Sequence, residues 1–248
     1  MPYDQSEADF NEAAYGMYLT YELQRWFELQ DDLDGIALPP TLQDEADLGY
    51  DMSIPRKWGF LYLQFKMPDY LRRSNASEWR IFGEPYFRFK VKTDVTANGC
   101  IQHNVLCDLE AEGETVSYAA PAFLTSDELT DYALNDGMYS NSAFPLPSDL
   151  GHVPARSNHC FAYTDCRDVR AFSEPGPSVS RGFDELTSRV RGVVGESEPI
   201  VLHEFLSRSA VRLVEVIGAS SRSDVGPSQS ILLASSSVGL MPILVSTE

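Results

Sequence analysis

The spacing of apolar residues predicts a long amphipathic helix near the start of the chain. Residues 7–30 contain few helix breakers, and their apolar side chains recur at helical spacing, which places them along one side of a helix. The turn residues between Asp31 and Gly35 are expected to end this helix. The apolar positions of this helix are Phe10, Ala14, Met17, Tyr21 and Trp26.

The pattern then changes to that of an antiparallel hairpin. Residues 51–54 form a short extended piece, residues 55–59 supply turn residues, and residues 60–65 are apolar enough for a buried strand. If the chain reverses near Lys57, strand pairing places Asp51 opposite Gln64. The hairpin therefore brings a carboxylate and a side-chain amide to the same place.

Alternation along the second strand of this hairpin separates two sets of side chains. Because successive residues of a strand point to opposite faces of a sheet, Tyr62, Gln64 and Lys66 share one face. The other face carries Leu61, Leu63 and Phe65. A carboxylate, an amide and an ammonium group are thus expected to converge at one edge of a sheet.

The remaining chain predicts further strands and helices around this hairpin. Residues 67–85 are expected to form short turns, residues 86–91 a strand, residues 100–112 a helix and residues 115–120 a strand. Beyond residue 124 the predicted elements are less regular. They are a helix from Ser126, a hairpin of residues 159–162 and 169–173, helices at 183–193 and 200–217, and short apolar runs at 231–234 and 238–245.

Charge is unevenly distributed along the 248 residues, although the formal net charge is -18. Residues 51–93 carry nine Arg and Lys against four Asp and Glu, while the flanking segments are strongly acidic. A phosphate backbone binds to basic surfaces, so the segment around the hairpin is the part of the chain suited to nucleic acid. The basic residues expected to contact nucleic acid are Arg56, Lys57, Arg72, Arg73, Arg88 and Lys90.

Composition also bears on compartment and on metal binding. The chain contains neither a run of eighteen apolar residues nor a basic and then apolar start, so a cytoplasmic protein is expected. Its four cysteines form no CxxC pair and are expected to be buried thiols. The alternative is a zinc site, built from Cys100, His103, Cys107, His159 and Cys160.

The trio at the hairpin suggests metal-assisted hydrolysis. Carboxylate and amide oxygens bind hard divalent cations, so Asp51 and the Gln64 carbonyl are the expected metal ligands. The charge of Lys66 would stabilise an anionic transition state or orient the attacking water.

The arrangement of an Asp, a gap of about a dozen residues and Gln-x-Lys at the end of an apolar strand resembles the PD-(D/E)xK nuclease superfamily. It is most similar to the Mrr-like restriction endonucleases in which Gln replaces Glu. The resemblance implies an α/β fold with a restriction-endonuclease-like αβββαβ core, and the predicted order of elements agrees with it. We therefore expect a nuclease-like core in residues 1–124 and a mixed C-terminal extension in residues 125–248.

The same resemblance implies further site residues. In the superfamily, a Glu from the helix before the metal strands often points toward the site. Glu22 is the matching position here, with Glu12 as its rival, because ten helical residues rotate one from the other by only about 80°. The second core helix often adds a polar side chain, for which Gln102 and His103 are the candidates.

The function that the resemblance implies is a Mg²⁺-dependent or Mn²⁺-dependent DNA endonuclease, acting in restriction or phage defence. Double-strand cutting needs two sites, so a homodimer or other defence-system subunits are expected as partners. The alternative function is a noncatalytic binding or scaffold subunit of a defence assembly, in which other chains supply the chemistry.

Overall fold

The computed structural model describes residues 6–40, 49–57, 59–76, 78–96, 99–166, 168–173, 176–178 and 186–188. The chain divides into two compact units, residues 1–193 and residues 194–248, and every described residue belongs to the first. The helix predicted at 200–217 and the apolar runs after it lie outside the described residues, as does most of the helix predicted at 183–193. Within the described ranges, no helix is both long enough and apolar enough to cross a membrane.

The first helix, α1, spans Glu12–Leu29 and begins at Asn11, whose side chain accepts a hydrogen bond from the Ala14 N–H at 2.8 Å. Its position matches the prediction, but its buried face does not. Met17 and Tyr21 are 57% and 61% exposed, so the expected orientation of the helix is wrong. The side chains that the helix buries against the sheet are Tyr15, Leu19, Leu23 and Phe27.

The first sheet contains the predicted hairpin. Its strands lie in the order β1 (Met52–Arg56), β2 (Gly59–Phe65), β5 (Thr115–Pro121) and β6 (Ser142–Ala143). Strands β1 and β2 are antiparallel with Met52 opposite Leu63, which confirms both the turn near Lys57 and the predicted register. Strand β5 runs parallel to β2 after a crossover through helix α4 (Gln102–Ala111).

A third extended segment borders the first sheet at β1. Leu33 forms an isolated antiparallel bridge with Arg56, and Leu38 forms another with Ser53. The backbone N–H groups of Leu38 and Ser53 each donate to the carbonyl of the other, at 2.9 and 3.0 Å. Leu33 and Leu38 therefore border β1 through two isolated bridges, and residues 33–38 form no named strand. The third strand of the core was expected at residues 86–91.

The second sheet holds the strand that was expected in the core sheet. Its order is β3 (Asp69–Leu71), β4 (Tyr86–Lys90), β7 (Cys160–Tyr163), β8 (Val169–Ser173) and β9 (Gly176–Ser178), and all its pairings are antiparallel. The β7–β8 hairpin was predicted. Residues 67–85, predicted as turns, contain β3 and the short helix α3 (Trp79–Phe82).

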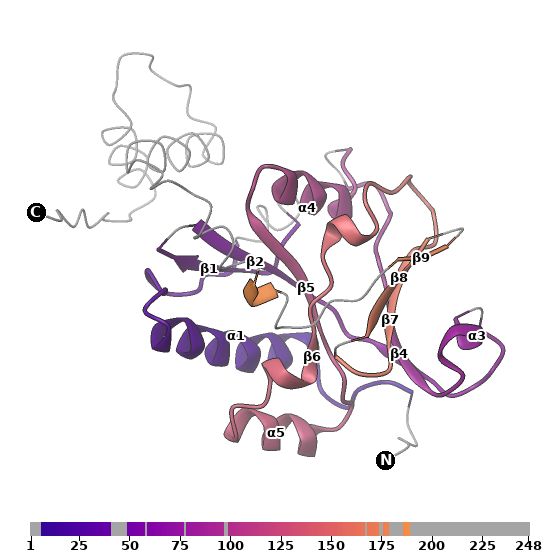
Figure 1. Cartoon of the computed structure of the whole chain (residues 1–248), viewed down its shortest axis with the longest axis horizontal. Coiled ribbons are helices and arrows are strands. Elements are labelled where there is room, and N and C mark those ends of the chain that lie inside the picture. Colours follow the sequence, from indigo (N-terminus) through magenta and orange to yellow (C-terminus); the bar gives the residue numbers. More distant parts are fainter. Residues whose placement is uncertain are drawn as a thin grey trace, which may run out of the picture. The chain divides into compact units, whose positions relative to one another are not determined.

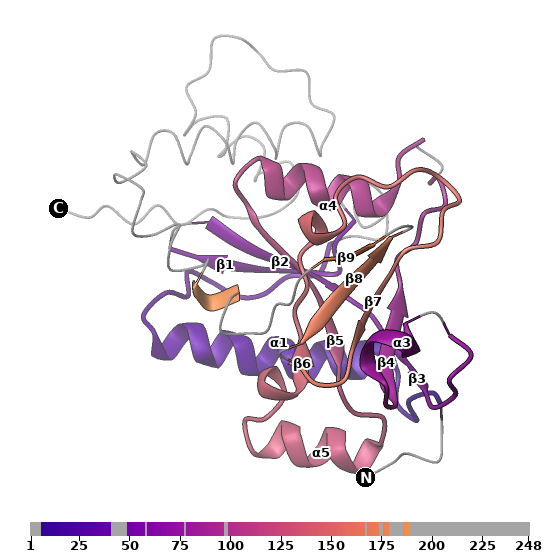
Figure 2. The same ribbon diagram turned by 45° about the vertical axis from the view of Figure 1, so that its right-hand side comes forward.

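The two sheets and the helices pack in layers (Figures 1 and 2). Leu61, Leu63 and Phe65 of β2 face α1 in one apolar core. Tyr62 belongs to a second core, which also contains Leu106 of α4 and Phe89 of β4. The first sheet is thus covered by α1 on one face and by α4 and the second sheet on the other, as the alternation along β2 predicts.

The domain boundary expected at residue 124 does not coincide with a boundary of the structure. Strand β6 pairs with β5, and β7 pairs with β4, so both sheets draw on residues beyond 124. Helix α5 (Ser126–Leu134), capped by Thr125 and Glu128, packs against α1. The described residues up to 188 therefore belong to the same compact unit as the hairpin.

Gly16 allows α1 to approach β2 closely. A Cβ atom at position 16 would lie 2.5 Å from Cε2 of Phe65, which is shorter than any normal contact. We expect Gly16→Ala to lower the free energy of unfolding by about 1–3 kcal/mol, measured by urea unfolding. The Phe65→Leu variant removes the ring, so the double variant should be more stable than the sum of the two single effects predicts; strict additivity would contradict this account.

Candidate active site

Asp51 directly precedes β1 and lies beside the last residues of β2. Its backbone N–H donates to the Leu63 carbonyl at 2.8 Å, which extends the ladder by one step. Its carboxylate Oδ2 then accepts the backbone N–H of Phe65 at 2.6 Å and the side-chain Nε2 of Gln64. At the end of the sheet, the Asp51 carboxylate therefore accepts the Phe65 N–H in place of a main-chain carbonyl.

Gln64 and Gln102 complete a chain of polar side chains that begins at Asp51. Gln64 is 2% exposed, and its Oε1 accepts a hydrogen bond from Nε2 of Gln102 on α4 at 2.8 Å. The predicted meeting of Asp51, Gln64 and a polar residue of the second core helix is therefore observed. The orientation of the Gln64 amide differs from the expectation, because its nitrogen faces the carboxylate and its oxygen faces Gln102.

Lys66 follows directly after β2. Its backbone N–H donates to the Ala119 carbonyl at 2.9 Å, so the strand alternation continues and places the side chain on the same face as Gln64. The residue is 9% exposed. A lysine is rarely buried to this degree unless its ammonium group has a partner.

Glu22 does not belong to this group of side chains, and its predicted site role is wrong. It lies on the buried side of α1, 5% exposed, and its two carboxylate oxygens accept the backbone N–H groups of Met138 at 2.7 Å and Tyr139 at 3.3 Å. Burial raises the pKa of this carboxyl group, although the two hydrogen bonds oppose the shift. Glu22 thus anchors the chain after α5, at the short helix η1 (Tyr139–Asn141).

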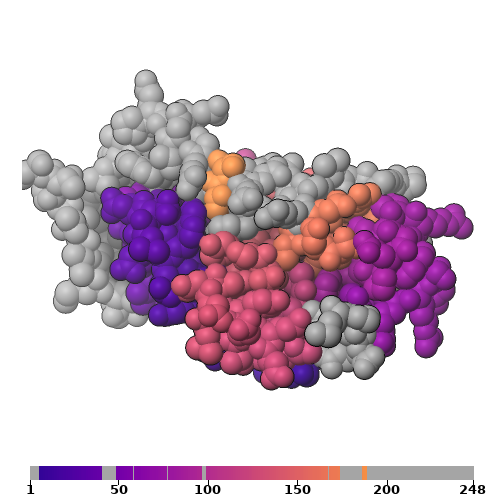
Figure 3. All heavy atoms as spheres, turned by 60° about the horizontal axis from the view of Figure 1, so that its bottom comes forward, coloured from indigo at the N-terminus to yellow at the C-terminus, as the bar shows by residue number. Residues whose placement is uncertain are grey.

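Its rival Glu12 lies on the side of α1 that borders Asp51. Glu12 and Asp51 line a pocket of about 570 Å³ between α1 and the hairpin. Figure 3 shows the face of the molecule on which α1 and α5 lie side by side. Two carboxylates, which are hard oxygen donors, therefore line the same pocket, whereas the Gln64 amide lies outside its lining. Its lining residues are Glu12, Ala13, Gly16, Met17, Thr20, Tyr21, Gln24, Asp51, Met52 and Phe65.

His103 is part of the packing beneath α4, and its predicted catalytic role is wrong. It is 1% exposed, and its two ring nitrogens lie 2.8 Å from the Tyr118 hydroxyl and 2.8 Å from the Gly151 carbonyl. Because Tyr118 is paired with Gln64 in the β2–β5 register, His103 supports the strand next to the site. It contacts neither Asp51 nor the pocket.

Burial lowers the pKa of His103 below its usual value of 6.5. A neutral native imidazole that must become charged on unfolding binds fewer protons than the unfolded state does. Stability is therefore expected to be full above pH 6.5 and to fall as the pH drops toward the lowered pKa of the native state. Urea unfolding at several pH values will measure this slope, and a His103→Gln variant that unfolds with an unchanged slope would contradict the assignment.

Arg56 and Lys57, neighbouring basic residues of the hairpin that were both predicted to bind DNA, have different environments. Arg56 is 3% exposed, lies over the ring of Phe27 at 5.1 Å and donates from Nε and a terminal nitrogen to the Asp32 carboxylate at 2.9 and 2.5 Å. It is therefore a structural residue, and its predicted contact with DNA is wrong. Lys57 is exposed and pairs with Asp31 at 2.8 Å.

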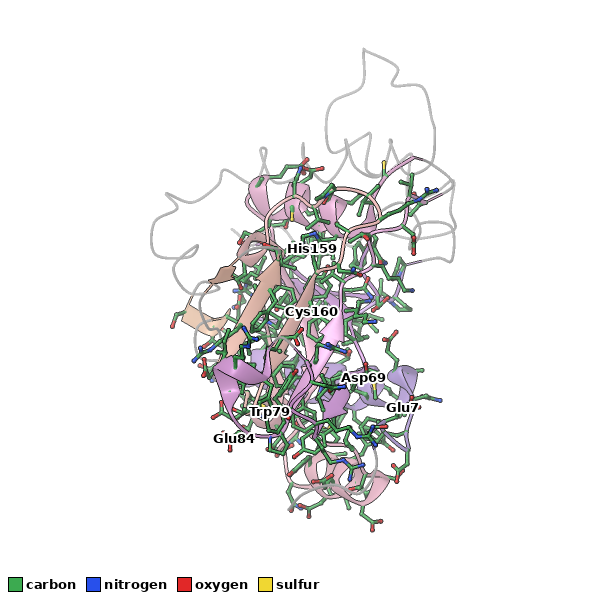
Figure 4. All side chains as sticks on the ribbon, turned by 90° about the vertical axis from the view of Figure 1, so that its right-hand side faces the viewer. Glu7, Asp69, Trp79, Glu84, His159 and Cys160 are labelled. Atoms are coloured by element: carbon green, nitrogen blue, oxygen red, sulfur yellow. The ribbon has the colours of Figure 1, made fainter. Side chains whose placement is uncertain are left out.

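The other predicted DNA contacts lie on or near the second sheet, which Figure 4 shows from the side of α3. Arg88 and Lys90 alternate with the core residues Phe87 and Phe89, so they point to the outer face of this sheet, away from α1. Arg72 and Arg73 are exposed after β3. The basic residues of the sequence segment therefore do not form one surface around Asp51.

A buried acid partly neutralises this outer face. Glu78, 5% exposed, accepts hydrogen bonds from the Tyr86 hydroxyl at 3.2 Å, Arg88 at 3.4 Å and the Cys160 thiol at 3.4 Å. Burial alone would raise the pKa of Glu78, but these contacts lower it overall. Burial and the Glu78 charge together raise the pKa of Cys160 to about 12, so this cysteine is a protonated thiol.

The alternative zinc site is not assembled by the described residues. Among them, no group of three or more His, Cys, Asp and Glu side chains is placed to hold a metal ion. Cys100 is exposed, while Cys107 is buried with its sulfur 3.6 Å from Nε2 of His103. Burial raises the pKa of Cys107 to about 12, which is opposite to the thiolate that zinc requires.

One pocket residue escaped the sequence analysis. Thr20 is 6% exposed, and its Oγ1 has no hydrogen-bond partner among the described residues. Its position follows from the helical repeat, because Glu12, Gly16, Thr20 and Gln24 are each one turn apart along the pocket side of α1. The orientation of the helix, which the apolar pattern predicted wrongly, was the missing information.

Comparisons with protein-family models, with curated proteins and with solved structures find no match to this chain.

Proposed function

We propose that this protein is a metal-dependent nuclease that hydrolyses phosphodiester bonds in DNA, with its active site at Asp51. The observation that carries the proposal is the convergence of three elements on one strand end. The hairpin supplies the Asp51 carboxylate and the Gln64 amide, and α4 supplies Gln102. The resemblance to PD-(D/E)xK nucleases implies these residues, with Asp51 opposite Gln64 in the hairpin.

The donor set of the pocket fits Mg²⁺ or Mn²⁺. Glu12 and Asp51 are carboxylates that line the same pocket, and carboxylate oxygens are the protein ligands that these ions prefer. Rotation of the Gln64 amide by 180° would present its oxygen to the Asp51 side, with Gln102 able to rotate in concert because an amide both donates and accepts. A bound ion would supply Lewis-acid polarisation of the phosphate and a more acidic attacking water.

The protein's own residues would position and balance charge around the reacting phosphate. Asp51 and Glu12 would hold the cation and orient water in the pocket. Gln64 donates a hydrogen bond to the Asp51 carboxylate in the structure, and after rotation its oxygen would face the ion instead. Lys66, at the end of the strand on the Gln64 face and outside the pocket lining, would stabilise negative charge on phosphate oxygens at this edge of the sheet.

The arrangement of the first sheet supports a restriction-endonuclease-like core. Helix α1 is followed by three antiparallel segments, residues 33–38, β1 and β2. Helix α4 then crosses to β5, which is parallel to β2. We propose that residues 33–38, which form two isolated bridges with β1, stand for the third strand of an αβββαβ core, in place of residues 86–91.

Two observations favour the alternative of a noncatalytic binding or scaffold subunit, a nuclease fold without nuclease chemistry. The replacement of the usual Glu by Gln64 leaves fewer negative charges to hold a cation, and the described residues contain no cluster of three acids, histidines or cysteines. The two functions differ in their response to metal, since only the nuclease should be both stabilised by Mg²⁺ and active with it.

Plasmid cleavage tests the proposal directly. The purified chain should nick or linearise supercoiled plasmid with Mg²⁺ or Mn²⁺ and should be inactive with EDTA. Lys66→Met, which keeps the length of the side chain but removes its charge, should abolish cleavage, whereas Lys92→Met, at an exposed lysine outside the predicted DNA contacts, should not. Full activity of a folded Lys66→Met protein would refute the assigned role, and no cleavage together with no thermal stabilisation by Mg²⁺ would favour the scaffold function.

A further inference from the structure

The pocket beside Asp51 contains groups that the hydrolytic chemistry does not use. Two adjacent rows of α1 line it, one with Gly16, Thr20 and Gln24 and one with Met17 and Tyr21. The second row is exposed, with Met17 at 57% and Tyr21 at 61%. A volume of about 570 Å³ is more than a cation and its waters need, so a larger part of the substrate can enter.

The chemistry of this lining fits an aromatic ring with a polar edge. Tyr21 offers a ring face on which a base can stack, and Met17 offers a polarizable thioether beside it. Arg25 lies over the Tyr21 ring, 5.9 Å from its centroid, and also pairs with Asp136 at 2.7 Å. Tyr21 is therefore held at the rim of the pocket by a neighbouring side chain of α1.

Thr20 supplies the polar contact in the interior. Its buried hydroxyl has no hydrogen-bond partner among the described residues, and a buried hydroxyl without a partner carries a free-energy cost that a ligand can remove. Gln24, one turn further along α1, adds an amide that can both donate and accept. Together they can read the polar edge of a nucleobase.

The spacing along α1 relates this part of the pocket to Asp51. Gly16 packs close to the ring of Phe65 and lines the same pocket as Asp51. Thr20 lies one helical turn further, roughly 5–6 Å along the axis. A nucleotide whose phosphate lies at Asp51 can therefore extend its base toward Thr20 and Tyr21.

The distribution of basic residues argues against an intact duplex at this site. Arg56 is buried and paired with Asp32, and Arg88 and Lys90 lie on the outer face of the second sheet. Among the described residues, the pocket side of α1 thus offers acids, aromatic and apolar groups instead of a broad basic footprint. Single-strand binding adds base stacking on aromatic side chains to contacts between basic residues and the backbone, and a base inside a duplex cannot enter a pocket without leaving the stack.

We propose that the pocket binds the base of an unpaired nucleotide, so that the substrate is single-stranded DNA or a duplex with an unpaired segment. This inference rests on the proposed function, because it places the scissile phosphate at Asp51. Tyr21 stacks on the base, and Thr20 donates to or accepts from its edge. No base-specific contact is assigned, since a hydroxyl and an amide can satisfy any of the four bases.

Equilibrium binding tests the inference separately from cleavage. The probes are a fluorescein-labelled oligothymidine of about 20 nucleotides and a blunt duplex of equal length. Binding is measured with Mg²⁺ present, and all variants carry Asp51→Asn so that cleavage does not consume the probes. The single strand should bind at least about tenfold more tightly than the duplex, and Tyr21→Ala should weaken single-strand binding about tenfold. Tyr18→Ala, an exposed tyrosine of α1 outside the pocket lining, is the matched control and should have no effect.

Thr20→Val provides a second variant with an unusual expected combination. Removing a buried hydroxyl that has no partner should raise the midpoint of thermal unfolding, while it weakens single-strand binding by about threefold to tenfold. A hydroxyl with a purely structural role would instead lower the midpoint. Equal binding of duplex and single strand, or equal effects of Tyr21→Ala and Tyr18→Ala, would overturn the inference.

The outcomes separate this inference from the proposed function. Metal-dependent plasmid cleavage by the unmodified protein, with no effect of Tyr21→Ala on single-strand binding, would leave the nuclease standing and remove the base pocket. Tyr21-dependent binding of the single strand without any cleavage by the unmodified protein would retain the base pocket and remove the nuclease. Loss of both results would overturn both proposals.

Discussion

Replacing Asp51 by Asn is expected to slow metal-dependent DNA cleavage by about 10²- to 10³-fold while the protein stays folded. The Asn side-chain oxygen can still accept the Phe65 N–H that Asp51 binds at 2.6 Å, so the end of the sheet keeps its acceptor. The variant loses the negative charge that a divalent cation needs. Plasmid cleavage over a range of Mg²⁺ concentrations, with thermal unfolding of the same samples, will measure both effects.

Asp34→Asn serves as the control for this variant. Asp34 is an exposed acid whose backbone N–H donates to the Pro55 carbonyl of β1, so it borders the same hairpin without lining the pocket. Its substitution should leave cleavage unchanged. If folded Asp51→Asn protein cuts as fast as the unmodified chain, Asp51 does not hold the catalytic ion.

The second large effect concerns stability. Arg56→Ala is expected to lower the free energy of unfolding by about 2–4 kcal/mol, because Arg56 is 3% exposed and bound to an Asp32 side chain that is 18% exposed. The loss has two sources, the ion pair with Asp32 and the contact of the guanidinium with the Phe27 ring at 5.1 Å. Urea unfolding monitored by circular dichroism will measure it.

Lys57 offers a matched control at the next position. Its ion pair with Asp31 joins side chains that are 42% and 93% exposed, and exposed pairs of this kind contribute little to stability. Lys57→Ala should therefore change the free energy of unfolding by less than about 0.5 kcal/mol. Similar losses for the two variants would show that Arg56 is not a buried structural residue.

The hairpin could be predicted from the sequence because its local signals agree. Turn residues between two apolar pieces fix the point of reversal, and the period of two then determines which residues face each other. The observed pairing of Met52 with Leu63 places Asp51 beside Gln64, and the apolar residues of β2 face α1 as expected. Local patterns were sufficient where the partner strand is only a few residues away.

The orientation of α1 could not be predicted with the same certainty. Its sequence contains two apolar stripes, and the stripe with Met17 and Tyr21 was expected to be buried. The helix instead buries Tyr15, Leu19, Leu23 and Phe27, because this continuous row fits against the side chains of β2. The rotation moves Glu22 into the interior and brings Glu12 and Thr20 to the pocket, so the choice between Glu22 and Glu12 depends on tertiary packing.

Long-range pairing explains the other differences. Residues 86–91 have the alternation of a strand, but alternation does not identify the sheet to which a strand belongs, and β4 pairs with β3 and β7. The basic residues of this segment are close in sequence and are divided between the hairpin and the outer face of the second sheet. A charged segment therefore predicted a binding surface that the fold does not assemble.

The carboxylate of Asp51 has two roles. Its Oδ2 accepts the last N–H of the sheet, from Phe65, and the same carboxylate is the candidate cation ligand. Any ion that withdraws electron density from this oxygen must also weaken its bond to the Phe65 N–H. Ion binding in the pocket would thereby change the hydrogen bond of the Phe65 N–H in β2 without movement of a loop or a domain. The amide of Phe65 is, in effect, a spectroscopic reporter built into the strand, and its chemical shift would register ion binding before any nucleic acid is added.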